Sequence, residues 1–79
     1  MTGLFKTDHI ELKKIMAEKE IKTIKELSEK SGINRNTLAQ VFDGKKQPSS
    51  DVMERIVITL DINPEKAGAI FFKRNLRNA

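Results

Sequence analysis

Residues 23–48 constrain the fold most strongly, because they carry start and stop signals for two short helices. Thr23, followed three residues later by Glu26, has the form of a capping box, which marks the start of a helix. Gly32 suits the position after the last turn, where a positive φ angle costs glycine least. Asn34 is a strong N-cap for a second helix, which stops at the next glycine. The stretch therefore predicts two short helices joined by a tight turn.

Similar signals divide the rest of the chain into three further helices. Asp8 with Glu11 forms a second capping box, Ser49 is an N-cap, and Asn63 precedes a proline at a first helical position. Apolar residues follow each cap at spacings of three and four, and no strand-like alternation of useful length occurs. The sequence predicts an all-α protein of five helices. Shared face spacing assigns one core to Leu27, Leu38, Val41, Ile56 and Leu60.

The length of 79 residues allows one domain, so we treat residues 1–79 as a single unit. Within it we expect an N-terminal arm over residues 1–7, loose over residues 1–6 unless Leu4 and Phe5 dock on the core. The two central helices occupy residues 23–43, and a C-terminal helix spans residues 64–77.

Composition excludes several classes of function. The chain has no cysteine, which removes disulfides and thiolate chemistry and fits a reducing compartment. No apolar run approaches the length of a membrane span, and no signal peptide is visible at Met1. The only histidine, His9, has no acidic or metal-binding residues arranged around it, so we expect it to be solvent-exposed. We therefore expect a cytoplasmic protein with no enzymatic activity, no metal, no cofactor and no membrane contact.

The charge balance indicates a polyanionic partner, although only weakly. The formal net charge is +4 and the pI is near 9.6. Many soluble proteins carry a charge of this size for solubility alone.

The order of the signals resembles the helix-turn-helix proteins of the phage Cro and CI repressor type, the XRE family. The resemblance covers about residues 10–62 and implies a compact five-helix bundle of lambda-repressor-like type. In that family the second and third helices form the DNA-reading unit. The matching positions are Leu12 and Ile15, Thr23 with Glu26-Leu27-Ser28, Ser31-Gly32-Ile33-Asn34, Thr37-Leu38, Gly44-Lys45, Pro48-Ser49, Ile56, and Leu60-Asp61-Ile62.

Three departures from the family pattern stand out. Ile24 occupies the place of a glutamine that often contacts a phosphate and braces the reading helix. Met16 and Phe42 occupy the places of an arginine and a glutamate that often form a buried ion pair. We expect an apolar packing contact instead, which need not reduce stability. Asp43 lies on or near the exposed side of the reading helix, where a carboxylate near phosphates is unfavourable unless that end leaves the groove.

Base reading is assigned to one face of the second central helix. At about 100° per residue, its polar and small side chains share an arc opposite Leu38, Val41 and Phe42. Arginine pairs well with guanine, whereas asparagine and glutamine pair well with adenine, and alanine allows close approach. A polar helix face is also what solvent exposure alone produces, so the family resemblance carries much of this assignment. The predicted base-reading residues are Arg35, Asn36, Ala39 and Gln40.

Phosphate contacts are expected around this helix, from the helix starts and from the loop that follows it. Lysines in a loop are also common as solubility groups. The predicted phosphate-binding residues are Thr23, Lys25, Asn34, Thr37, Lys45, Lys46 and Gln47.

Dimerisation is implied by the resemblance, because two reading helices then meet successive major-groove turns about 34 Å apart. The candidate interface with a second copy or another protein is Ile70, Phe71 and Phe72. Three adjacent bulky residues cannot all face one side of a helix, so we expect Phe71 and Phe72 to divide between core and surface. The alternative is that Leu4 or Phe5 of the arm covers the exposed residue.

The resemblance implies a sequence-specific DNA-binding transcriptional regulator, a Cro-like repressor of a phage or mobile element that binds a double-stranded operator. One alternative is an antirepressor or modulator that binds a repressor protein through the same fold. Ile24, Asp43 and the apolar C-terminal helix favour this alternative mildly. A further alternative is an antitoxin, for which no residue reveals a toxin partner.

Overall fold

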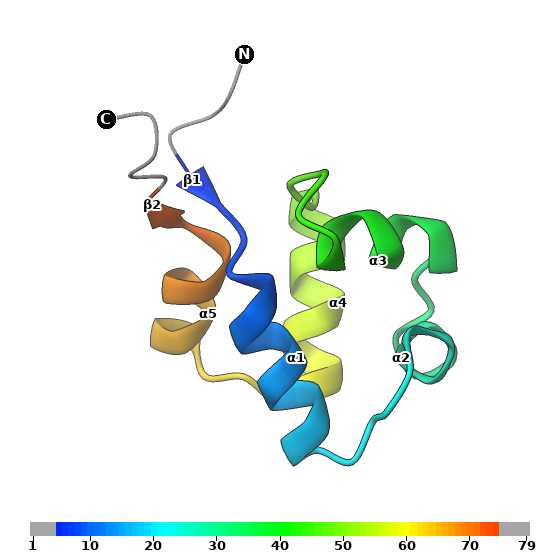
Figure 1. The fold of residues 1–79 in the computed structure, drawn as a ribbon. Coiled ribbons are helices and arrows are strands. Elements are labelled where there is room, and N and C mark those ends of the chain that lie inside the picture. Colours follow the sequence, from blue (N-terminus) through cyan, green and yellow to red (C-terminus); the bar gives the residue numbers. More distant parts are fainter. Residues whose placement is uncertain (1–4, 75–79) are drawn as a thin grey trace.

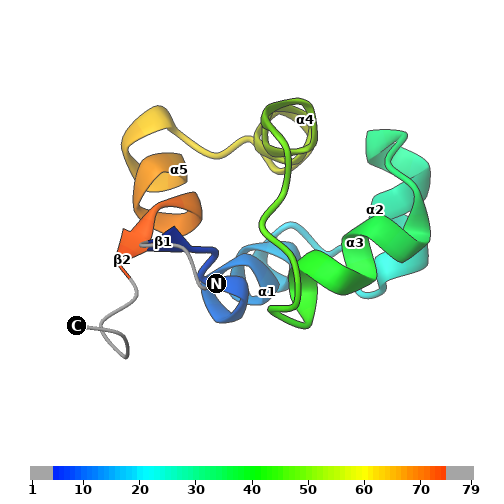
Figure 2. The same cartoon turned by 90° about the horizontal axis from the view of Figure 1, so that it is seen from above.

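The computed structural model describes residues 5–74, with Arg74 described for its backbone only. Five helices follow in order: α1 (His9–Glu18), α2 (Ile24–Ser31), α3 (Arg35–Phe42), α4 (Ser50–Leu60) and α5 (Pro64–Phe71). Two short strands, β1 (Phe5–Lys6) and β2 (Lys73–Arg74), flank them. Helices α1 and α4 occupy the middle of the bundle, with α5 and the strands on one side and α2 and α3 on the other (Figures 1 and 2). The predicted all-α bundle is confirmed.

Every helix begins at the capping side chain that the sequence predicts. The side chains of Asp8, Thr23, Asn34, Ser49 and Asn63 each accept a hydrogen bond from a backbone amide two or three residues further on. Each such bond satisfies a donor that the first turn of a helix leaves free. Local chemistry therefore sets the helix starts.

The core draws on all five helices. The five residues predicted for it are confirmed, since each is fully shielded from solvent. Burial of each such side chain stabilises the fold by roughly 1.5–3 kcal/mol. The largest fully buried side chains are Phe71, Leu12, Leu27, Leu38, Ile56, Leu60, Ile70 and Val41.

The C-terminal helix is shorter than predicted. It ends at Phe71 instead of extending over residues 64–77, and the chain then turns into β2. Strand β2 pairs antiparallel with β1, with Lys73 opposite Lys6. The last three residues of the predicted helix, including Leu76, lie outside the described residues.

The reason for this early end lies in two carbonyl groups of the last turn. The Ile70 carbonyl accepts a hydrogen bond of 2.7 Å from the backbone amide of Asp8. The Phe71 carbonyl accepts one of 2.6 Å from the side-chain amide of Gln47. A continuing helix would offer these carbonyls to amides four residues further along. Donors from distant segments take that place, and the helix ends.

The N-terminal arm is more ordered than the sequence predicted. Phe5 and Lys6 form β1, and Thr7 is buried. The expectation of a loose arm over residues 1–6 is therefore wrong for Phe5 and Lys6, because β2 supplies backbone partners, and Gln47 accepts a hydrogen bond from the adjacent Thr7. Residues 1–4, including Leu4, lie outside the described residues.

His9 is half-buried, which corrects the expectation that it is solvent-exposed. Its ring packs against Gly44, where an added Cβ atom would lie 3.3 Å from the imidazole Cδ2. The imidazole Nδ1 is buried, without a hydrogen-bond partner among residues 5–74. This contact joins the start of α1 to the turn that follows α3.

Candidate DNA-binding surface

The turn between α2 and α3 is fixed by a glycine and by two serines. Gly32 adopts φ of +75°, the left-handed conformation predicted for it. The Ser28 hydroxyl donates to the Ile33 carbonyl over 2.5 Å, and the Ile33 amide donates to the Ser31 hydroxyl over 3.2 Å. Sequence reasoning missed both serine contacts, although serine commonly bonds to nearby backbone at turns. These bonds hold the backbone of Ile33, and with it the turn between the two helices.

Helix α3 is anchored by one face and free on the other. Leu38, Val41 and Phe42 are buried, as predicted. Arg35, Asn36 and Gln40 are exposed and Ala39 is half-buried, so the predicted base-reading residues are accessible. Figure 1 shows α3 at the edge of the bundle, next to α2. The helix is thus rigidly held with a polar outer face.

The predicted phosphate contacts come from the starts of α2 and α3 and from the loop after α3, and the side chain of one of them is engaged within the fold. Thr23 and Lys25 are exposed at the start of α2, and Asn34 is exposed at the start of α3, where its side chain also caps the helix. Thr37 is half-buried. Gln47 differs, because its side-chain amide is engaged with Thr7 and Phe71.

The loop after α3 folds back on the helix. The backbone amides of Lys45 and Lys46 both donate to the Gln40 carbonyl, over 2.9 and 3.3 Å. This arrangement places two exposed lysines next to the last turn of the reading helix. Neither lysine forms an ion pair with a carboxylate among the described residues. Their charges are therefore available to an external anion.

Asp43 is exposed and forms the C-cap of α3. It thus lies at the opposite end of the helix from Arg35 and Asn36. Its carboxylate adds a negative charge two residues before Lys45, which opposes phosphate binding at this end of the helix.

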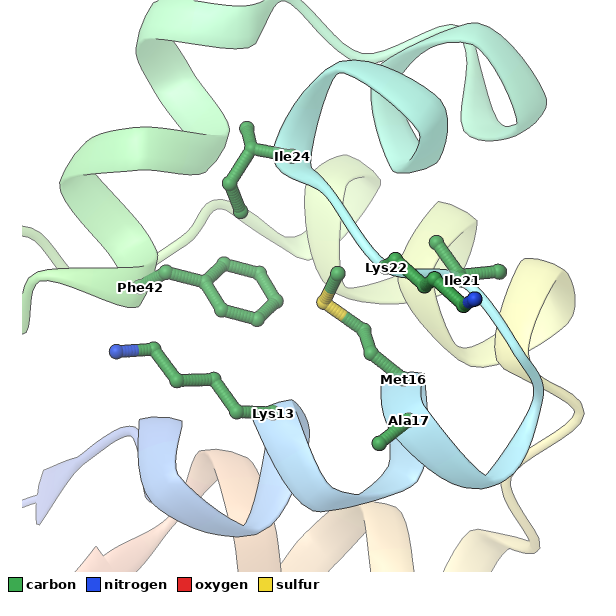
Figure 3. Close-up of a pocket in the computed structure, with 7 residues that line it drawn as sticks. All are labelled: Lys13, Met16, Ala17, Ile21, Lys22, Ile24 and Phe42. Atoms are coloured by element: carbon green, nitrogen blue, oxygen red, sulfur yellow. The ribbon is translucent and has the colours of Figure 1, made fainter.

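Two of the family departures meet in space. Met16 and Phe42, at the places of the family ion pair, are both buried. Ile24, at the place of the glutamine, packs against the same core. Figure 3 shows the three side chains converging between α1, α2 and α3. The predicted apolar packing contact between Met16 and Phe42 therefore gains a third member.

The candidate interface needs correction at two of its three residues. Ile70 and Phe71 are only 2% exposed and belong to the core, so they cannot contact a partner. Phe72 is 53% exposed, which confirms the predicted division between adjacent phenylalanines. Its ring meets that of Phe5 edge-on, with centroids 6.1 Å apart. Because Phe5 is itself 49% exposed, the two rings form one aromatic surface.

Comparisons with known proteins identify the family to which this arrangement of helices belongs. Among residues 5–74, no helix has both the length and the apolar character needed to cross a bilayer. Searches of curated proteins and of solved structures gave no match. The family model for the Cro/C1-type helix-turn-helix DNA-binding domain matches residues 11–66, which include α2, the turn and α3. The chain therefore belongs to the Cro/C1-type helix-turn-helix DNA-binding family.

Proposed function

We propose that the protein is a sequence-specific transcriptional regulator that represses by occupying an operator, in the manner of a Cro repressor of a phage or mobile element. The proposal rests mainly on one observation, which is that α3 has a buried apolar face and an exposed polar face. Three buried apolar residues hold the helix, while Arg35, Asn36 and Gln40 project from its other face. These side chains form paired hydrogen bonds with base edges in the major groove.

Phosphate contacts on both sides of α3 fix the position of this helix along the DNA. Thr23 and Lys25 approach one stretch of backbone, and Lys45 and Lys46 approach another. Such contacts supply affinity without sequence information, whereas the α3 side chains discriminate between bases. The folded-back loop ties the second pair of phosphate contacts to Gln40 itself.

A second copy of the chain extends the site. One reading helix covers only a few base pairs, and two copies reach half-sites about 34 Å apart. The aromatic surface of Phe5 and Phe72 is the contact that we assign to this dimer, in place of Ile70 and Phe71. Aromatic rings are enriched at protein interfaces.

A second candidate function is modulation of a repressor protein through the same fold. It is favoured by Ile24, because an isoleucine at this place cannot make the phosphate contact of the family glutamine. Its side chain packs instead against the core.

Selection from a random duplex pool with the purified protein tests the main proposal. A DNA regulator enriches one motif, and its affinity falls steeply with salt, by about 0.9 log units per log unit of salt for each phosphate contact. A matched control is the Arg35→Ala, Gln40→Ala double variant, which should lose the motif and retain salt-sensitive binding. A pool without enrichment would contradict the proposal, and tight binding to a purified repressor would then favour the modulator.

A further inference from the structure

The ribbon formed by β1 and β2 has two faces of different chemistry. Lys6 lies directly opposite Lys73 in the antiparallel register, and both side chains are exposed. Because successive side chains of a strand point to opposite faces, these two lysines share one face and Phe5 lies on the other. We call Lys6 and Lys73 the lysine face. Like charges directly opposite each other oppose strand pairing, so an external anion at this face would relieve their repulsion.

The lysine face carries a surplus of positive charge. Lys6 forms no ion pair with a carboxylate among residues 5–74. The ammonium group of Lys73 lies 3.3 Å from the Asp8 carboxylate. That carboxylate also accepts a hydrogen bond from the Glu11 amide at the start of α1. One carboxylate with a second partner thus faces two lysines.

Hydrogen bonds hold the ribbon beside the loop that follows α3. The Thr7 hydroxyl donates to the Gln47 side-chain oxygen over 2.8 Å. Lys6 precedes Thr7 and Lys46 precedes Gln47, so this bond brings together two lysine-bearing stretches of backbone. In both views the loop lies between α3 and the two strands (Figures 1 and 2). The ribbon therefore continues the positive charge of the loop beyond the C-terminal end of α3.

We propose that the lysine face binds the phosphate backbone of DNA, next to the phosphates held by Lys45 and Lys46. This contact rests on the proposed function, and it adds an element outside the family domain, because the family model matches residues 11–66 and both strands lie beyond them. DNA supplies the anion that offsets the repulsion between Lys6 and Lys73. The contact adds affinity without discriminating between bases. The aromatic side chain of Phe5, on the other face, stays free for a second copy.

The salt dependence of binding to a random duplex tests the contact. Lys6→Gln should reduce the magnitude of the slope of log affinity against log salt by about 0.9, the value for one lost phosphate contact. Lys19→Gln makes the same change in charge at the C-cap of α1, which ends at the opposite end of the bundle from the strands (Figure 1). This control should keep the wild-type slope. An unchanged slope for Lys6→Gln, or an equal reduction in Lys19→Gln, would overturn the proposal.

A variant that frees Lys73 should act in the opposite direction. Asp8→Asn keeps a side chain that caps α1 and removes the carboxylate that competes for the Lys73 ammonium group. Affinity for the random duplex should rise about twofold to fivefold at low salt. Asp61→Asn is the matched control, because it removes an exposed carboxylate at the C-cap of α4, far from the strands (Figure 1). Lower affinity in Asp8→Asn, or an equal gain in Asp61→Asn, would contradict the contact.

Ethylation of single phosphates in the selected operator locates the contact. Lys6→Gln should become insensitive to ethylation at one or two phosphates beside those to which Lys46→Ala becomes insensitive. An interference pattern for Lys6→Gln identical to that of the wild type would refute the ribbon contact. A selected motif together with a wild-type salt slope for Lys6→Gln would refute the ribbon contact alone. A pool without a motif, together with a reduced slope for Lys6→Gln on random duplex, would refute the proposed regulator alone.

Discussion

The side-chain amide of Gln47 donates a hydrogen bond of 2.6 Å to the main-chain carbonyl of Phe71. Its oxygen accepts another, of 2.8 Å, from the hydroxyl of the buried Thr7. Gln47, in the loop after α3, thus connects the segment before α1 with the end of α5. The loop that carries Lys45 and Lys46 is thereby joined to the chain segments at β1 and β2 that carry the aromatic surface.

Replacing Gln47 should therefore destabilise the whole domain. Gln47→Ala leaves the Thr7 hydroxyl and the Phe71 carbonyl without this partner, and we expect a loss of about 1–3 kcal/mol in unfolding free energy. Urea unfolding followed by helical circular dichroism measures it. Gln40→Ala, at a side chain that makes no hydrogen bond among the described residues, is the matched control and should change stability by less than about 0.5 kcal/mol. Similar stabilities for the two variants would contradict the bridging role.

Two glycine-to-alanine changes should shift the melting temperature in opposite directions. Gly32 has φ of +75°, so Gly32→Ala should cost about 1–2 kcal/mol. Gly68 lies inside α5, and an added Cβ would meet nothing within 4 Å. Gly68→Ala should stabilise by about 0.5–1 kcal/mol, because alanine favours helix. Thermal unfolding compares them, and an unchanged melting temperature for Gly32→Ala would exclude the strained turn.

Acid should remove a contribution of Asp8 to stability. Burial alone would raise the pKa of its carboxyl, but hydrogen bonds from the Glu11 amide and the Lys73 ammonium group outweigh burial and hold that pKa below the ordinary 3.8. A carboxyl with a lowered pKa in the folded state stabilises above its unfolded pKa. That stabilisation is lost as the pH falls below about 3.8 through the folded value.

The comparison of wild type with Asp8→Asn isolates this effect. Asparagine still caps α1 but cannot titrate, so the variant should lose less stability between roughly pH 5 and pH 2. Asp43→Asn, at an exposed carboxylate, should follow the wild type. Parallel pH curves for wild type and Asp8→Asn would show that Asp8 contributes nothing.

Phe72→Glu should leave the domain folded and weaken the contact between two copies of the chain. The side chain is half exposed, so the domain should stay helical with only a small loss from the ring contact with Phe5. Cooperative binding to an operator with two half-sites should fall, while binding to one half-site survives. Ile58→Glu is the control, since Ile58 is 70% exposed on α4. Sedimentation with and without operator measures assembly, and a wild type that stays monomeric in both conditions would exclude the dimer.

The helix starts and the core were predictable because their signals are local. An N-cap such as Asn34 acts over two or three residues, and the core residues repeat at the helical period. The end of α5, the role of Gln47 and the packing of His9 on Gly44 were not. Each depends on segments distant in sequence, as Thr7 and Gln47 illustrate at a separation of 40 residues.

In the candidate site, too, part of the structure could be predicted from the sequence and part could not. The faces of α3 follow from its period, so the exposure of Arg35 and Gln40 was predictable. The fold-back of Lys45 and Lys46 onto Gln40 was not, because it depends on loop backbone hydrogen bonds. Sequence comparison also paired Met16 with Phe42 but gave no indication that Ile24 joins them at the edge of a pocket.

The central claim, that α3 reads bases while the following loop holds phosphates, is tested most directly by two variants on two DNAs. Gln40→Ala should lose about 1–3 kcal/mol on the selected operator and little on random duplex. Lys46→Ala should weaken both DNAs alike and reduce the salt slope by about one. Equal losses on operator and random duplex for Gln40→Ala would contradict base reading by α3.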